Sequence, residues 1–178
     1  MTPQAAGSTR ALFLNGTVGA GKTTTADGIG AILRRHDRSH AIIDLDWLRN
    51  AWPSPADDPF HTELELANLA AVTRNFVRAG AERLILAGVI ESAADRRRYE
   101  EALAMPLTVC RLILPLSTLR SRIIARHPPG AERDWHLART GELHAILDAA
   151  QVDDVTVTID GEPPDAVAAL VLSASGWR

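Results

Sequence analysis

One eight-residue segment limits the folds open to this chain more than any other. Residues 16–23 have the sequence Gly-Thr-Val-Gly-Ala-Gly-Lys-Thr, a complete match to the pattern G-x-x-x-x-G-K-[S/T]. The apolar residues 10–14 precede it, and residues 24–36 carry apolar side chains at helical spacing. A loop of this pattern between a buried strand and a helix is typical of a phosphate-binding loop, or P-loop.

The chemistry of such a loop assigns a role to each kind of residue in it. Glycines let the backbone curl so that its N–H groups face phosphate oxygens, and the following helix adds its positive N-terminal end. Lys22 would reach the β- and γ-phosphates of ATP, and the Thr23 hydroxyl would bind Mg²⁺. The candidate nucleotide-binding residues are Gly16, Thr17, Val18, Gly19, Ala20, Gly21, Lys22, Thr23 and Thr24.

Lys22 also stands out in the composition. Lysine and arginine together number 19, and every one except Lys22 is arginine. The alternative to a P-loop is a glycine-rich turn before an ordinary helix. The motif, its context and the single lysine together favour the P-loop.

Length and charge restrict the remaining possibilities. A chain of 178 residues corresponds to one domain, here taken as 1–178. A net charge of −3 disfavours a nucleic-acid partner bound through a broad basic surface. No run approaches 18 apolar residues, so we expect no membrane partner. The only cysteine, Cys110, is expected to be a buried apolar side chain, and a cytoplasmic location fits it.

Two carboxylates follow the second predicted strand, residues 39–44. Asp44 and Asp46 would lie at the rim where parallel α/β sheets bind ligands, and Arg49 follows them. One carboxylate would hold Mg²⁺ through water, the other would accept a proton from an attacking hydroxyl, and Arg49 would bind the acceptor. The structural alternative is that Asp46 caps a helix that begins at Trp47.

A P-loop followed by Asp-Leu-Asp-Trp-Leu-Arg at residues 44–49 resembles the adenylylsulfate kinases. It is also similar to the wider group of small P-loop phosphotransferases, which includes gluconate kinases and chloramphenicol phosphotransferase. The resemblance implies a three-layer α/β P-loop NTPase fold whose five parallel strands have the order 2-3-1-4-5. It also implies that Asp46 is the base and that Arg49 binds substrate.

Residues 83–96 resemble the strand, loop and basic helix that follow in that family, with two departures. Glu91 places negative charge where a sulfate would otherwise sit. This disfavours adenylylsulfate and favours an acceptor with hydroxyl or amino groups. The strand expected at residues 84–90 also lacks the usual terminal Asp, so Thr23 and Asp44 are the predicted metal ligands.

A predicted helix at residues 117–126, broken by His-Pro-Pro-Gly at 127–130, resembles the start of the lid of small P-loop kinases. We expect the lid to span about residues 117–139. Arg122 and Arg126 share a helix face and would stabilise charge on the transferring phosphoryl group, while Arg133 would contact substrate. The alternative is a solvated basic face.

Other segments are assigned more coarsely. The Pro-rich residues 53–59 would form a loop over the acceptor pocket, with its flanking aromatic residues packed on the core in preference to a stacking role. Residues 61–79, 135–150 and 165–172 are expected to be helices, and 107–114 and 155–159 strands.

By resemblance, Gly161 would lie near the adenine. The six histidines have no familiar metal spacing, so Mg²⁺ is the only metal expected.

The sequence thus predicts an ATP-dependent kinase that transfers the γ-phosphoryl group to a hydroxyl of a small molecule. One alternative is a nucleotide-binding module or sensor with little transferase activity. Another is an antibiotic or nucleoside phosphotransferase. The acceptor itself is not specified, and a homodimer is one option for the assembly.

Overall fold

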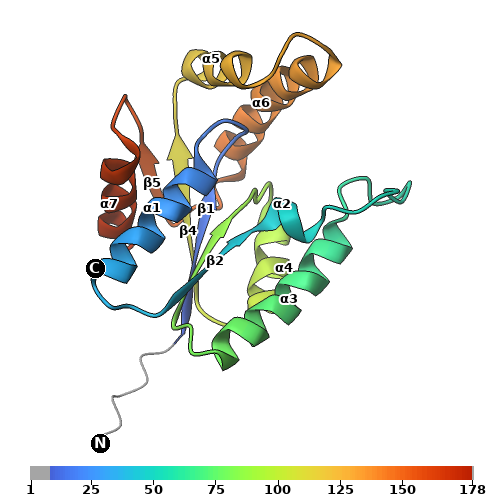
Figure 1. Cartoon of the computed structure of the whole chain (residues 1–178). Helices are drawn as coiled ribbons and strands as arrows, with labels where there is room; N and C mark the ends of the chain where they lie inside the picture. Colours follow the sequence, from blue (N-terminus) through green and yellow to red (C-terminus); the bar gives the residue numbers. More distant parts are fainter. Residues whose placement is uncertain (1–8, 178) are drawn as a thin grey trace, which may run out of the picture.

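The computed structural model describes residues 9–177, in which parallel strands alternate with helices (Figure 1). The strands are β1 (Arg10–Asn15), β2 (His40–Asp44), β3 (Arg83–Ala87), β4 (Leu107–Ile113) and β5 (Val155–Thr158). The helices are α1 (Lys22–Arg35), α2 (Leu45–Leu48), α3 (Thr62–Arg78), α4 (Ala93–Leu103), α5 (Leu116–Arg126), α6 (Ala131–Ala150) and α7 (Pro164–Ala174).

The five strands form one parallel sheet in the order β2-β3-β1-β4-β5. This confirms the predicted fold class and strand order. β1 lies in the centre, where Leu12 is level with Ile85 of β3 and Thr108 of β4. Because all strands run the same way, their carboxyl ends meet at one edge, and β1 delivers the P-loop to the middle of that edge.

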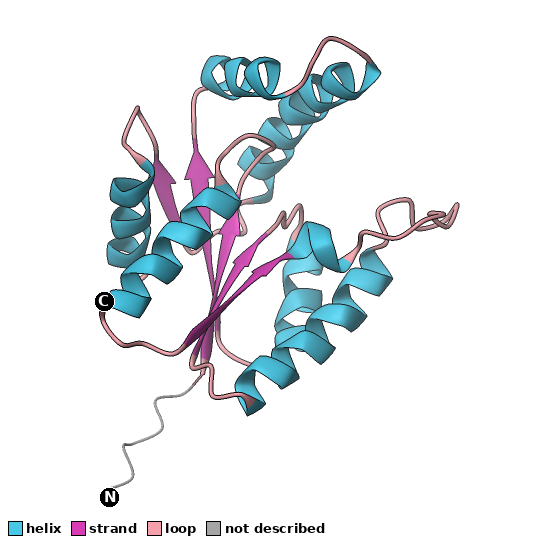
Figure 2. Ribbon diagram, viewed as in Figure 1, coloured by secondary structure: helices cyan, strands magenta, loops and turns pink. Residues whose placement is uncertain are grey.

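Helices cover both faces of the sheet (Figure 2), and a separate hydrophobic core lies between the sheet and the helices on each face. Alternate side chains of β1 point to opposite faces, so Leu12 and Leu14 join the core formed with α1 and α7. Ala11 and Phe13 join the core formed with α3 and α4. Cys110 is completely buried, as predicted, and burial raises the pKa of its thiol to about 12.

Helices α5 and α6, joined by the turn of residues 127–130, form a hairpin beyond the carboxyl edge of the sheet, beside the P-loop (Figure 1). We call this segment the α5–α6 hairpin. In residues 9–177, no helix combines the length and apolar character needed to cross a membrane.

Two boundaries differ by three or more residues from the sequence predictions. α6 begins at Ala131 instead of residue 135, since Gly130 ends the proline-containing turn and the acidic residues Glu132 and Asp134 suit the first turn of a helix. β3 ends at Ala87 because the chain then leaves the sheet at Gly88, where a Cβ atom would lie 2.4 Å from a side-chain carbon of Leu45.

Burial along α3 is uneven. Leu69 and Thr73 are buried, but the apolar residues Phe76 and Val77 near the C-terminal end are 36% and 37% exposed. Glu65, in the first turns of the helix, is buried, with only 1% of its surface exposed. The Glu65 carboxylate can be buried because Arg49 and Tyr99 pair with it.

Candidate active site

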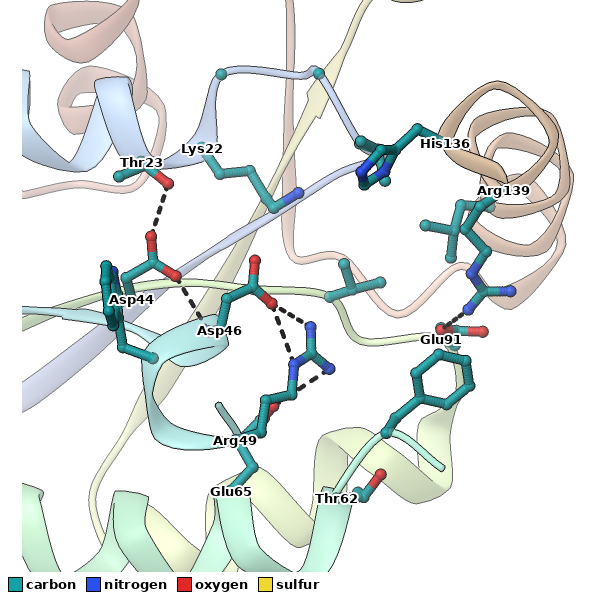
Figure 3. A pocket seen from close by; sticks show the side chains of 18 of the residues that line it. Lys22, Thr23, Asp44, Asp46, Arg49, Thr62, Glu65, Glu91, His136 and Arg139 are labelled. Carbon is teal, nitrogen blue, oxygen red and sulfur yellow. Dashed lines mark hydrogen bonds and ion pairs between the residues drawn. The ribbon is translucent and has the colours of Figure 1, made fainter. Parts of the chain in front are cut away.

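One cavity of about 1120 Å³ lies at the carboxyl edge of the sheet, between the P-loop, α2, α3, the segment after β3 and the α5–α6 hairpin (Figure 3). It brings together most of the predicted site residues, although they come from distant parts of the chain. Those that line it are Val18, Gly19, Gly21, Lys22, Thr23, Thr24, Asp44, Asp46, Arg49, Glu91, Arg122 and Arg126.

The P-loop closes around the side chain of its own lysine. Gly21 has a left-handed backbone with φ of 90°, a conformation that glycine adopts without strain, and α1 starts at the next residue. The Nζ atom of Lys22 donates hydrogen bonds to the carbonyl oxygens of Gly16 and Thr17, at 2.8 and 3.0 Å. The ammonium group is thereby held at the mouth of the loop.

Burial lowers the pKa of Lys22 to about 8, although the carboxylates of Asp46 and Asp44 act in the opposite direction. The ammonium group has therefore lost much of its hydration, and its attraction for an anion is correspondingly strong. Both carboxylates lie close enough to influence it electrostatically. All three side chains line the same cavity.

Thr23 and Asp44 are joined directly. The Thr23 hydroxyl donates to Asp44 Oδ2 at 2.9 Å, and Asp44 Oδ1 accepts from the backbone N–H of Asp46 at 3.1 Å. Asp44 is thus the N-cap of α2, which corrects the alternative role suggested for Asp46. Hydroxyl and carboxylate oxygens are the donors that Mg²⁺ prefers, so the two side chains fit the predicted metal site.

Asp46 lies in the first turn of α2 and is held by Arg49. The Nε atom of Arg49 donates to Asp46 Oδ1 at 3.1 Å, and Nη2 contacts the same oxygen. Arg49 Nη1 also lies 3.4 Å from Oε2 of Glu65. The Tyr99 hydroxyl donates to the other Glu65 oxygen. Two carboxylates therefore fix the guanidinium (Figure 3), and the Tyr99 hydroxyl orients one of them.

The protonation equilibria of this group reflect burial and pairing. Burial raises the pKa of Glu65, while the Tyr99 hydrogen bond and the Arg49 charge act against that rise. For Arg49, burial acts to lower the pKa, but Asp46 and Glu65 together raise it. The guanidinium stays charged, and its charge is shared between two carboxylates.

The opposite wall of the cavity contains a second acid–arginine pair. Arg139 Nη2 binds Glu91, and Arg139 Nη1 lies 3.3 Å from Glu142. The guanidinium carbon lies 5.7 Å from the centre of the Phe60 ring, within cation–π range. Glu91 therefore does not present unpaired negative charge, which modifies the expectation from sequence.

The basic residues of the α5–α6 hairpin divide into two groups. Arg122 and Arg126 line the cavity, and Arg122 Nη1 donates to the Gly19 carbonyl of the P-loop at 3.2 Å. Arg133 lies on α6 and does not line the cavity. Gly161, which follows β5, does not line the cavity either. The predicted roles of Arg133 in substrate binding and of Gly161 near the adenine therefore have no support from the lining of this cavity.

The aromatic residues near the Pro-rich loop do not pack on the core. Trp47 and Trp52 are 75% and 92% exposed, and Phe60 is 49% exposed. Trp47 and Phe60 line the cavity, whereas none of residues 53–59 does. The expected packing of this loop and its expected position over the pocket are both wrong, because the loop projects away from the sheet (Figure 1).

Asn15 is a further buried residue that shapes the site and was not predicted from the sequence. Asn15, at the end of β1, is fully buried. Its amide oxygen accepts from the backbone N–H groups of Gly16 and Ile90, and its nitrogen donates to the Ile90 carbonyl and to Asp153. It ties the first residue of the P-loop to the segment after β3. Its only sequence signal is an amide at the end of an apolar strand.

Comparisons with known proteins establish the fold. Neither a scan against protein-family models nor a search of curated proteins gives a match. Among solved structures, a shikimate kinase from Acinetobacter baumannii in complex with shikimate is similar with a TM-score of 0.65 and 17% identity, covering 94% of this chain and 93% of that one. An APS kinase from Mycobacterium tuberculosis in complex with AMPPNP and APS has a TM-score of 0.62 and 20% identity, covering 94% and 97%.

A tunicamycin resistance protein from Deinococcus radiodurans has a TM-score of 0.62 and 21% identity, covering 93% of this chain and 94% of that one. These chains are of similar length to the present one and align over almost all of it. The chain therefore has the fold of the small P-loop kinases that phosphorylate small molecules.

Proposed function

We propose that the protein is an ATP-dependent kinase that transfers the γ-phosphoryl group to a hydroxyl of a small molecule. The observation that carries the proposal is the meeting of Lys22, Asp46 and Arg49 in one cavity. A protein that only binds nucleotide needs the lysine, but it does not need a carboxylate held by an arginine beside it. The neighbouring folds, which include kinases of several acceptors, support the same assignment.

The P-loop binds the phosphates of ATP. Its backbone N–H groups and the N-terminal end of α1 face the phosphate oxygens, and Lys22 exchanges its two carbonyl contacts for contacts to the β- and γ-phosphates. Thr23 and Asp44 hold Mg²⁺. When bound, Mg²⁺ neutralises phosphate charge and orients the oxygens of the γ-phosphate.

Asp46 acts on the acceptor. Arg49 binds its Oδ1 atom, and in the described residues no partner is found for Oδ2, which accepts the proton of the acceptor hydroxyl. The acceptor oxygen then forms a bond to the γ-phosphorus as the bond to the bridging oxygen of ADP breaks. Lys22, Arg122 and Arg126 stabilise the negative charge on the transferred group.

The pairing of charges in the acceptor half favours an uncharged acceptor. Arg49 is compensated by Asp46 and Glu65, and Arg139 by Glu91. An anionic acceptor would compete with these carboxylates for the two arginines. The cost is largest at Glu65, whose side chain is 2% exposed, and small at Asp46, which is 74% exposed. A neutral polyhydroxylated molecule can hydrogen-bond to the paired groups as they stand.

The test is acceptor-dependent release of ADP from Mg²⁺–ATP. The panel of acceptors contains adenylylsulfate, sugar acids, neutral sugars, nucleosides and hydroxylated antibiotics. We expect turnover with at least one uncharged hydroxyl compound, and loss of that turnover in Lys22→Ala and in Asp46→Asn. Asp165→Asn, a matched change at the exposed start of α7, should leave turnover unchanged.

The alternative function is a nucleotide sensor. It predicts tight ATP binding that requires Lys22, with no ADP release above background for any acceptor and no effect of Asp46→Asn. That result would overturn the kinase proposal. Dependence of ADP release on Asp46 separates the two functions, because both need the P-loop for ATP binding.

A further inference from the structure

A cluster of potential metal ligands lies at the turn of the α5–α6 hairpin, apart from Thr23 and Asp44. It consists of His127, Glu132 and His136, and their ligand atoms all lie within 4.8 Å of one another. Glu132 Oε1 is 3.3 Å from His127 Nδ1 and 3.8 Å from His136 Nε2. The cluster arises because Glu132 and His136 are one helical turn apart and the Pro-Pro-Gly turn folds His127 back beside them.

These distances suit a common metal ion. For ligands at about 2.0 Å from Zn²⁺ in a tetrahedron, neighbouring donor atoms are about 3.3 Å apart. One measured edge has this length, and the other exceeds it by 0.5 Å, which a rotation of the exposed Glu132 side chain would close. The third edge, between the two histidine nitrogens, is at most 4.8 Å.

The orientation of the two rings also fits. The His127 and His136 rings lie 4.5 Å apart, and the indole of Trp135 packs on the edge of His136 at 4.9 Å. His136 Nδ1 is buried with no hydrogen-bond partner in the described part of the chain. Packing therefore fixes this ring, and it directs the other nitrogen toward Glu132.

The donor set selects the kind of ion. Two imidazoles and one carboxylate suit zinc and its neighbours in the first transition row, and they suit Mg²⁺ poorly, because Mg²⁺ prefers oxygen donors. From the sequence we expect no metal besides Mg²⁺, because the six histidines have no familiar metal spacing; Glu132 and a histidine from the turn complete this cluster only in the folded chain. A local pair of His–Glu contacts without a metal is the competing explanation.

We propose that His127, Glu132 and His136 bind one divalent transition-metal ion of the Zn²⁺ class, at a site separate from the nucleotide-bound Mg²⁺. Both histidines line the large cavity, next to Arg126 in sequence and one turn before Arg139. A bound ion would join the turn of the hairpin to α6 and so restrict the movement of the arginines that face the cavity. Water or a ligand in the cavity would complete the coordination.

The test uses untagged, nucleotide-free protein in an excess of Mg²⁺, titrated with Zn²⁺ by calorimetry and with Co²⁺ by absorption and fluorescence. We expect one Zn²⁺ per chain with a micromolar or tighter dissociation constant, and quenching of Trp135 emission by Co²⁺. His127→Ala and His136→Ala should each weaken binding by roughly tenfold or more, and Glu132→Gln by a smaller factor. Circular dichroism checks that each variant is folded.

The matched control is His144→Ala. His144 lies on the same helix and pairs with Asp148 one turn away at 3.7 Å, but it has no third ligand, so Zn²⁺ binding should be unchanged. Trp135→Phe should keep the affinity and lose most of the Co²⁺ quenching. Equal Zn²⁺ affinity in the wild type, His127→Ala and His136→Ala would overturn the proposal, whether or not the protein has kinase activity.

Discussion

The Thr23 hydroxyl and the Asp44 carboxylate lie 2.9 Å apart, which joins the first turn of α1 to the end of β2. One residue belongs to the P-loop motif and the other follows it by 21 positions, so the sheet, not the motif, brings them together. The contact places two oxygen donors beside the position of the phosphates.

Thr23→Ala should reduce kcat with Mg²⁺–ATP on the order of 100-fold, because a metal ligand worth several kcal/mol of transition-state stabilisation is lost. Thr23→Ser keeps the hydroxyl and should stay within a few-fold of the wild type. Steady-state ADP release across a range of Mg²⁺ concentrations measures both. Equal activity of the alanine and serine variants would exclude this hydroxyl as a ligand.

Nucleotide binding should take up a proton at mildly alkaline pH. The Lys22 pKa of about 8 means that near pH 8.5 roughly three quarters of the lysines are uncharged, and phosphate contacts restore the charge. At about pH 6.5 the lysine is already protonated before nucleotide binds, so proton uptake on binding should be near zero. Calorimetry in buffers of different ionisation enthalpy measures the uptake. Lys22→Arg, which stays charged at both values, is the control.

Glu65→Gln should make the folded protein more stable and at the same time weaken acceptor binding. The pKa of Glu65 is raised in the folded state, so its ionisation costs stability as pH rises above the unfolded value of 4.5. The glutamine variant should therefore gain stability relative to the wild type between about pH 4 and 7, while a less firmly held Arg49 raises the acceptor KM by roughly tenfold.

The control for that prediction is Glu63→Gln. Glu63 also pairs with an arginine from α4, Arg98, but it is 77% exposed. We expect its stability difference from the wild type to be small and almost independent of pH. Thermal unfolding of the three proteins at several pH values provides the measurement. A Glu65→Gln variant that loses stability steadily as pH rises would contradict the argument.

The sequence predicts those parts of the protein that local rules determine. The P-loop and its flanking strand and helix follow from a contiguous motif and from apolar segments. The strand order was predicted from the resemblance to the small P-loop phosphotransferases. Asp46 and Arg49 are three residues apart on one short helix, and their pairing depends on that local geometry.

The parts that were missed depend on long-range contacts. Glu65 meets Tyr99 across 34 positions, and Arg139 meets Glu91 across 48. In sequence, Glu65, Tyr99 and Arg139 resemble ordinary residues of amphipathic helices, and nothing identifies Arg139 as the partner of Glu91. Their pairing appears only when the helices pack, and this pairing determines which charges in the cavity remain available to a substrate.

Asn15→Ala should destabilise the protein by about 3 kcal/mol. The change removes the partners of the Gly16 and Ile90 backbone groups in a fully buried position, where unsatisfied groups are costly. Asn75→Ala, at an exposed position of α3, should cost less than about 0.5 kcal/mol. Urea unfolding gives both values, and comparable values for the two variants would show that Asn15 does not anchor the P-loop.

The arginines of α5 should act on turnover more than on nucleotide binding. Arg122 and Arg126 face the cavity, whereas Arg120 is exposed on the same helix and does not line it. Arg122→Gln and Arg126→Gln should each lower kcat by roughly 100- to 1000-fold, because the charge that develops on the transferred phosphoryl group loses a donor. The dissociation constant for ADP should change much less, since most of its phosphate contacts come from the P-loop. Arg120→Gln should match the wild type in both measurements. If all three variants lose activity equally, general electrostatics of a basic helix explain the effect, and the two cavity-facing arginines have no specific role in transfer.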